Sequence, residues 1–167
     1  ARKAPLRRFA YCLTPKGFGE KSRLVAIYLD NSLSFYRLAR RQYTDIFAHA
    51  RAEGRSRLVL AGGGDLSEIA ILAAWDENII PLGILDSDTN LNHRYGVKVV
   101  RSLEEIGPFD AVVITDSRKP QKAYEAMREQ LPGAQVLAPP LLKIARDFGN
   151  AIAATHGRSG AEAVRHK

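Results

Sequence analysis

Cysteine is nearly absent from this sequence of 167 residues, in which Cys12 stands alone. One cysteine cannot form an intrachain disulfide, and it cannot build a cysteine-ligated zinc site. Long apolar runs are also missing: none approaches the roughly 20 residues that cross a bilayer, and no signal peptide opens the sequence. We therefore expect a cytoplasmic protein with no membrane partner and no metal site.

Neither proline nor glycine occurs between Glu20 and Ala52. Apolar residues recur there at intervals of three or four, which predicts one long helix with an apolar side. That side holds Leu24, Ile27, Tyr28, Phe35, Leu38, Ile46 and Phe47, with interruptions at Asn31, Gln42 and Asp45. Because an isolated helix of this length needs packing to persist, we expect a homodimer through Glu20–Ala50. The alternative is that the helix folds back on the rest of its own chain.

Acidic residues are scarce in the first third of the chain. Residues 1–57 hold 13 Lys/Arg and 4 Asp/Glu, a balance of +9, whereas residues 58–167 hold 12 and 14, a balance of −2. The two balances add up to the net charge of +7. Such asymmetry favours a polyanionic partner such as DNA for the first part of the chain. A solvated basic helix that binds no nucleic acid is the alternative.

Alternating apolar residues over residues 6–13 predict a strand, and Thr14-Pro15-Lys16-Gly17 then supplies a turn and a helix start. The run from Phe9 to Gly17, followed by Glu20-Lys21-Ser22-Arg23-Leu24, resembles the end of a MarR-type winged-helix domain, especially in exopolysaccharide-associated regulators. The resemblance covers about 30 residues and implies a basic wing strand followed by a dimerisation helix. It also implies that the wing contacts DNA through Arg2, Lys3, Arg7 and Arg8. The helix-turn-helix that would precede the wing is not in the sequence, so we expect the natural protein to extend further toward the N-terminus.

From Arg57 onward, short apolar strands alternate with helices. We expect strands at residues 57–61, 79–85, 97–100, 111–115 and 135–137, and helices at 68–75, 103–106, 120–130 and 141–153. Strands that alternate with helices imply a parallel sheet with right-handed crossovers. The predicted fold is therefore α/β, with a Rossmann-like parallel five-stranded sheet and helices on both faces, preceded by the basic wing strand and the long dimerisation helix.

A glycine cluster follows the first of these strands. Gly62, Gly64 and Ser67 fit the pattern G-x-G-x-x-(small). In this pattern Gly62 makes a tight turn, Gly64 lets a phosphate approach backbone N–H groups, and Ser67 allows close helix packing. Asp86 ends the next strand, 24 residues after Gly62, where a carboxylate can bind ribose hydroxyls. The candidate ligand-binding residues are Gly62, Gly63, Gly64, Asp65, Ser67, Asp86, Thr115, Asp116 and Ser117. The alternative is that the glycines serve only a tight turn.

The stretch Val59–Asp116 is similar to small Rossmann-like domains of bacterial polysaccharide enzymes, including sugar O-acyltransferases, membrane sugar transferases and epimerases. The similarity covers about 60 residues. It rests on Gly83-Ile84-Leu85-Asp86, Gly96-Val97-Lys98-Val99, Ser102-Leu103-Glu104-Glu105-Ile106 and Phe109-Asp110-Ala111-Val112-Val113-Ile114. It implies a phosphate-bearing small-molecule ligand, with NAD, CoA and nucleotide-sugars as the candidates.

We divide the chain into a winged-helix remnant (1–54), a Rossmann-like nucleotide-binding domain (57–153) and a polar C-terminal tail (157–167). The sequence contains no Tyr-x-x-x-Lys pair of the short-chain reductase kind, and no pattern in it demands catalysis. His93 lies in a polar loop, where a solvated side chain is the simpler interpretation. We expect a transcription regulator with a sensor domain for a nucleotide, nucleotide-sugar or dinucleotide. An enzyme or accessory domain acting on nucleotide-sugars in polysaccharide biosynthesis is the alternative, and a ligand-free dimerising scaffold is a third.

Overall fold

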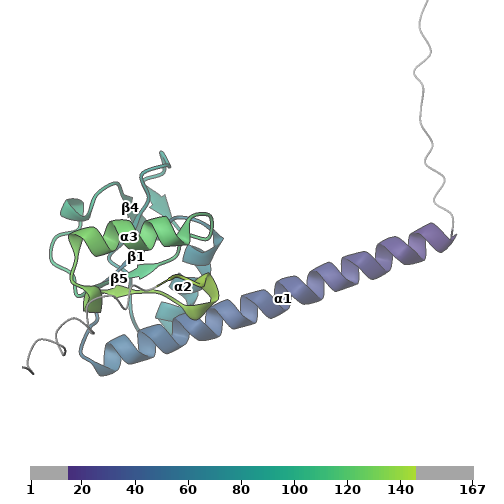
Figure 1. The fold of residues 1–167 in the computed structure, drawn as a ribbon, viewed down its shortest axis with the longest axis horizontal. Coiled ribbons are helices and arrows are strands. Elements are labelled where there is room, and N and C mark those ends of the chain that lie inside the picture. Colours follow the sequence, from purple (N-terminus) through teal and green to yellow (C-terminus); the bar gives the residue numbers. More distant parts are fainter. Residues whose placement is uncertain (1–14, 146–167) are drawn as a thin grey trace, which may run out of the picture.

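The computed structural model describes residues 15–145. The predicted wing strand, with Arg2, Lys3, Arg7 and Arg8, and the predicted C-terminal tail lie outside the described residues. The chain forms an α/β fold with a six-stranded sheet (Figure 1). In chain order the elements are α1 (Pro15–Ala52), β1 (Leu58–Ala61), α2 (Asp65–Asp76), β2 (Gly83–Leu85), β3 (His93–Arg94), β4 (Val97–Val100), η1 (Leu103–Glu105), β5 (Ala111–Ile114), α3 (Pro120–Gln130), η2 (Gly133–Gln135), β6 (Val136–Leu137) and η3 (Pro140–Leu142).

The strands lie in the order β3-β4-β2-β1-β5-β6. All neighbours pair in parallel except β3, which pairs antiparallel with β4. The sheet thus has six strands rather than the expected five, because β3 forms a hairpin with β4. The two residues between them, Tyr95 (φ 51°) and Gly96 (φ 76°), both have positive φ, as a tight two-residue hairpin turn requires.

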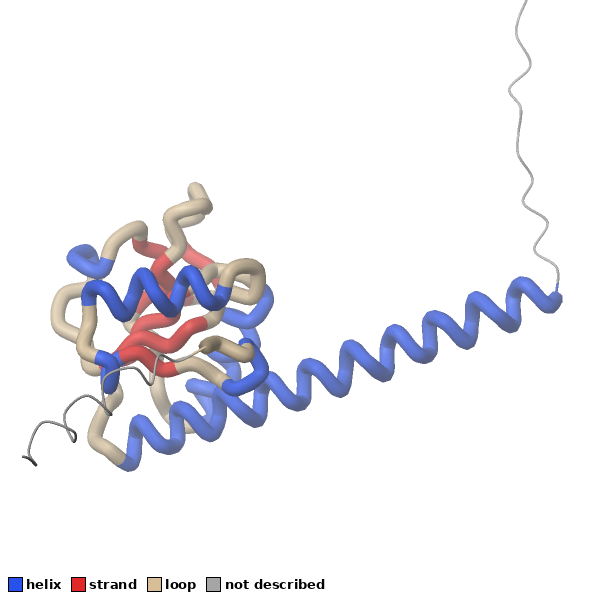
Figure 2. The backbone as a smooth tube through the Cα atoms, in the orientation of Figure 1, coloured by secondary structure: helices blue, strands red, loops and turns tan. Residues whose placement is uncertain are grey.

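Helices cover both faces of the sheet (Figure 2). Successive side chains of a strand point to opposite faces, so β1 contributes to two cores. Leu58 and Leu60 pack with residues of α1 and α2, whereas Val59 and Ala61 pack with residues of α3 and η1. All four residues of β1 are buried, as expected for a central parallel strand.

The long helix α1 has two unlike halves. Ala39, Tyr43, Phe47 and Ala50 are fully buried against the chain's own α/β domain, and α2 packs beside them. Every residue from Gly19 to Leu38 is exposed, and this half extends beyond the domain (Figure 1). The expectation of a dimer seam over Glu20–Ala50 is therefore wrong for the second half, which folds back on its own chain. Within residues 15–145, no helix is long and apolar enough to cross a membrane.

Other element boundaries differ from the sequence expectations for local reasons. β2 begins at Gly83 rather than at residue 79, since Pro81 has no N–H to contribute to a ladder. Residues 103–105 form a single 3₁₀ turn. The last helix does not begin at Leu141: η3 ends at Leu142, and Lys143 adopts a left-handed conformation (φ 50°) that stops helical continuation. Residues 146–153 lie outside the described part.

Candidate functional site

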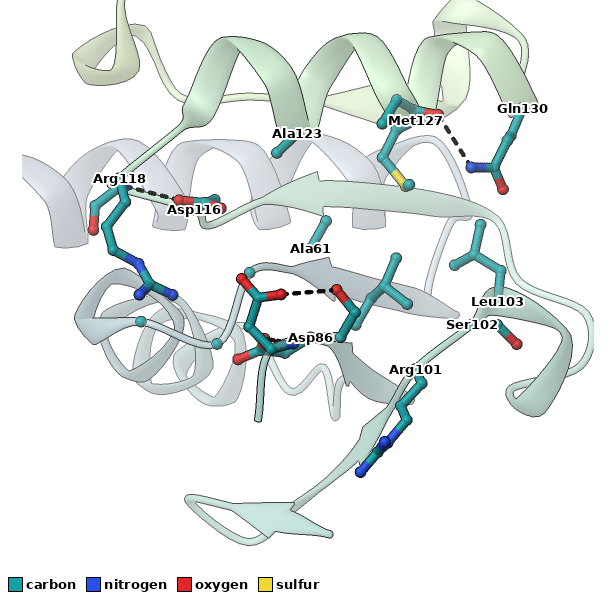
Figure 3. A pocket seen from close by; sticks show the side chains of 18 of the residues that line it. Ala61, Asp86, Arg101, Ser102, Leu103, Asp116, Arg118, Ala123, Met127 and Gln130 are labelled. Atoms are coloured by element: carbon teal, nitrogen blue, oxygen red, sulfur yellow. Dashed lines mark hydrogen bonds between the residues drawn. The ribbon is translucent and has the colours of Figure 1, made fainter. Parts of the chain in front are cut away.

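A cavity of about 410 Å³ opens at the carboxyl ends of the parallel strands (Figure 3). It lies where β1 leads to α2 on one face of the sheet and β5 leads to α3 on the other. Ligands of open α/β sheets bind in the crevice at such a switch point. The cavity is lined by Ala61, Gly62, Gly63, Gly64, Leu85, Asp86, Ser87, Asp88, Arg101, Ser102, Leu103, Glu104, Asp116, Ser117, Arg118, Ala123, Ala126, Met127 and Gln130.

Three consecutive glycines form one wall, and the structure gives each a different constraint. Gly62 has φ +116°, and a Cβ there would overlap the backbone of Asp116. A Cβ on Gly63 would overlap the carboxylate of Asp86. Gly64 has φ −79°, and a Cβ there would lie 3.6 Å from Ser117 Oγ, an ordinary contact. Close packing therefore requires glycine at positions 62 and 63, whereas Gly64 borders open space at the cavity.

Two buried hydroxyls hold the glycine loop from behind. Thr115 Oγ1 donates to the carbonyl of Gly62 at 2.6 Å, and Ser67 Oγ donates to the carbonyl of Gly64 at 2.6 Å. Both residues are fully buried and neither lines the cavity. Asp65, at the first turn of α2, is exposed and also lies outside the lining. The structure thus places these three candidate ligand-binding residues beside the site rather than in it.

The glycine loop presents donors to the cavity. Among the described residues, the N–H groups of Gly63 and Gly64 have no protein acceptor, while that of Gly62 donates to the Leu85 carbonyl at 2.9 Å. The loop also precedes the N-terminus of α2, where unpaired N–H groups and the helix dipole attract anions. A phosphate or carboxylate group of a ligand is the chemical complement of this wall.

Asp86 stands at the end of β2, with its carboxylate against Gly63. Its Oδ1 accepts from the N–H of Asp88 at 3.0 Å, which orders the turn after the strand. Its own N–H donates to the Val100 carbonyl at 3.0 Å. The carboxylate is therefore fixed at the rim beside the glycine loop, where ligand hydroxyls can donate to it.

The loop after β5 supplies a cation that sequence reasoning missed. Asp116 Oδ1 accepts from the N–H groups of Arg118 (2.7 Å) and Lys119 (2.9 Å), so its carboxylate shapes this loop. Ser117 and Arg118 line the cavity, and the Arg118 side chain extends toward its interior (Figure 3). The sequence feature that could have indicated Arg118 is its position, four residues after Ile114, the last residue of β5.

The end of the cavity away from Arg118 is apolar. Leu103 of η1 and Met127 of α3 lie there near Gln130, with Asp86 between them and Arg118 (Figure 3). Ala123 and Ala126 add a wall of small side chains. The spacing of Ala123, Ala126, Met127 and Gln130 places them on one side of α3, a pattern present in the sequence but not assigned to the site.

The charges of the lining are unequal. Four carboxylates (Asp86, Asp88, Glu104 and Asp116) face two guanidinium groups (Arg101 and Arg118). Hydrogen bonds from the Ser102 hydroxyl and from the backbone lower the pKa of the exposed Glu104 below its ordinary value. An acidic lining favours ligand hydroxyls and disfavours a ligand with many phosphate groups. Among the described residues, no group of three or more His, Cys, Asp or Glu side chains is placed to hold a metal ion.

The structure thus brings Gly62, Gly63, Gly64, Asp86, Asp116 and Ser117 together around one cavity and adds Arg101, Arg118 and an apolar end. The arrangement can bind a ligand that has an anionic group, hydroxyls and an apolar ring. No family model matches the chain, and no curated protein or solved structure matches it either.

Proposed function

We propose that the chain belongs to a transcription regulator, in which a Rossmann-like domain binds a nucleotide-type ligand. The order of the five parallel strands, β4-β2-β1-β5-β6, supports the Rossmann-like assignment. Renumbered along the chain, it is 3-2-1-4-5, the order of the first five strands of the dinucleotide-binding sheet 3-2-1-4-5-6.

One observation carries the ligand proposal: the glycine loop, Asp86 and Arg118 meet at a single cavity at the switch point. The free N–H groups of Gly63 and Gly64 and the Arg118 guanidinium would bind phosphate. Asp86 would accept hydrogen bonds from a ribose, and the apolar end at Leu103 and Met127 would take the base. The cavity volume of about 410 Å³ lies within the range of roughly 300–1,000 Å³ that is usual for small-molecule sites.

The charge of the lining ranks the candidate ligands. A diphosphate, as in NAD or a nucleotide-sugar, places its charge near Arg118. CoA brings a third phosphate to a lining that already holds more carboxylates than guanidinium groups. NADP would set its 2′-phosphate against Asp86, an unfavourable pairing of like charges. NAD and nucleotide-sugars are thus the favoured classes.

The exposed half of α1 supports the regulator and homodimer parts of the proposal. Leu24, Tyr28, Phe35 and Leu38 recur along one side and are 47–70% exposed. An exposed apolar strip of this kind is typical of a protein-protein contact. We propose that a second copy covers it, and that the basic residues preceding α1 contact DNA.

A thermal-shift screen of NAD, NADP, CoA, UDP-glucose and GDP-mannose tests the ligand site. A true ligand at about 100 times its dissociation constant stabilises the fold by about 2.7 kcal/mol. Asp86→Ala should weaken a ribose-bearing ligand by about 1.5–3 kcal/mol, as for hydrogen bonds to a charged group. Gly64→Val should block the phosphate wall while leaving the fold intact. Asp65→Ala is the matched control, because Asp65 is a nearby carboxylate outside the cavity.

Equal ligand responses of the parent, Asp86→Ala and Gly64→Val would place the ligand elsewhere. If no compound raises the parent's midpoint, the sensor proposal fails. Chemical turnover of a bound nucleotide-sugar, followed by chromatography, would favour the enzyme alternative instead.

A further inference from the structure

The helix α1 crosses the sheet at the edge where the cavity lies. Tyr43 donates its hydroxyl hydrogen to the carbonyl of Ile114, the last residue of β5, at 2.9 Å. The neighbouring Gln42 accepts from the N–H of Leu141, in η3, at 2.7 Å. Only a few residues earlier, at Leu38, α1 leaves the domain. Ala39 is buried in the core and Arg40 pairs with Asp76 of α2 at 2.6 Å, so Tyr43 is one of several contacts that hold α1, and it is the contact that reaches the carboxyl end of β5.

A short chain of hydrogen bonds joins Tyr43 to the glycine loop. The carbonyl of Ile114 and the N–H of Thr115 belong to one peptide group, and this N–H donates to the Ala61 carbonyl at 2.8 Å. Thr115 Oγ1 then donates to the Gly62 carbonyl. Ala61 and Gly62 both line the cavity. The same peptide group is thus bonded to α1 on one side and to the ligand loop on the other.

Burial and close packing prevent the groups that make this connection from moving independently. Tyr43, Ile114 and Thr115 are fully buried, and burial raises the pKa of Tyr43, so its hydroxyl stays protonated as a donor. A buried hydroxyl that loses its partner is costly, so Tyr43 must follow the Ile114 carbonyl if that carbonyl moves. The close packing of Gly62 on Asp116 leaves no slack between the loop and the end of β5.

We propose that occupancy of the glycine-loop site is transmitted to α1 through the peptide group between Ile114 and Thr115, with Tyr43 as its positioning residue on α1. That a ligand generates the signal rests on the proposed function. The hydrogen-bonded link between Tyr43 and the glycine loop does not depend on it. A ligand that draws the loop toward its phosphate moves this peptide group, and Tyr43 carries the movement into the helix.

The part of α1 that extends beyond the domain enlarges such a movement (Figure 1). From Pro15 to Leu38 it has 24 residues. At about 1.5 Å per residue it is about 36 Å long, so a tilt of about 5° displaces its end by about 3 Å. That end directly follows the segment proposed to contact DNA. The direction in which α1 leaves the domain thus becomes the output of the site.

Hydrogen exchange on the ligand-free protein tests the link. Tyr43→Phe removes only the hydroxyl, and amides of residues 61–66 and 114–119 should then exchange faster by about fivefold or more, the lower end of usual coupling between sites. Tyr36→Phe is the matched control, because the hydroxyl of Tyr36 accepts from Arg40, which pairs with Asp76 of α2, and among the described residues it makes no hydrogen bond to β5 or the glycine loop. Unchanged exchange in Tyr43→Phe overturns the link. Equal acceleration throughout α3 also overturns it, since that pattern reports general loss of stability.

Distance measurement by electron spin resonance tests the transmission. Spin labels are placed at Ala26→Cys on α1 and Glu129→Cys on α3, in a Cys12→Ser background, with excess unlabelled chain. Whichever of NAD, UDP-glucose or GDP-mannose raises the melting midpoint is the probe. It should shift the distance in the parent and in Tyr36→Phe, but not in Tyr43→Phe.

A probe that binds the parent without shifting the distance overturns the transmission and leaves the ligand site standing. If none of the probes raises the midpoint, the ligand proposal fails, and exchange in the ligand-free protein still decides whether the link exists.

Discussion

Gly62 and Gly64 are two residues apart in the same loop, yet replacing each with alanine should affect stability very differently. At Gly62, a side chain must adopt φ +116° and would lie 2.6 Å from Asp116 Cα. Backbone strain of this kind costs about 1–3 kcal/mol, and overpacking against neighbours that cannot move costs a further 1–3 kcal/mol, roughly. Gly62→Ala should therefore lower the free energy of unfolding by about 2–6 kcal/mol.

Gly64→Ala is the matched comparison. Its φ of −79° is open to any residue, and the new methyl group would meet only Ser117 Oγ at 3.6 Å. Its stability should stay within about 0.5 kcal/mol of the parent, or rise slightly because alanine restricts the unfolded chain. One kcal/mol shifts the melting midpoint by about 4 °C in a domain of this size. Calorimetry should thus find Gly62→Ala at least about 6 °C below Gly64→Ala. Midpoints within about 2 °C of each other would show that the loop does not pack on the end of β5 as described.

Two further predictions concern the N-terminal part of the chain. Light scattering should report twice the chain mass, and Leu38→Asp should shift the protein toward monomer because a charge would enter the proposed helix contact; a concentration-independent monomer in the parent would contradict the dimer. Binding to DNA should be weak, without sequence preference and steeply reduced by salt, since it would rest on contacts between basic residues and phosphate. Tight sequence-selective binding at high salt, measured by fluorescence anisotropy, would contradict that account.

The sequence predicted the parallel part of the sheet because β1, β4 and β5 are short runs of β-branched and aliphatic residues between helices. It did not predict β3, since His93 and Arg94 show no apolar alternation and the turn is Tyr-Gly rather than Asn-Gly. The apolar pattern of α1 runs through both of its halves. No local feature of the sequence indicates that, from Ala39 onward, α1 packs against the chain's own domain.

The candidate site was predictable where a residue type has one evident role at a strand end, as for the glycines and Asp86. The roles of Thr115 and Ser67 depend on side-chain direction, because each hydroxyl turns back to a loop carbonyl. The participation of Leu103 and Met127 depends on η1 and α3 sharing one face of the sheet. That arrangement is set by the crossovers of the whole fold and not by nearby residues.

The two outermost strands of the sheet, β3 and β6, are only two residues long. Open sheet edges are templates on which further chains can add, and short or charged edge strands prevent this growth. At one edge β3 ends after two residues in the Tyr95-Gly96 turn, and at the other Pro139 and Pro140 soon follow β6 and cannot donate to a new ladder. Among residues 15–145, both edges of the sheet are therefore poor templates for the addition of further chains. The proposed dimer would instead use side chains on α1, and a contact between two helices can stop at a defined number of chains.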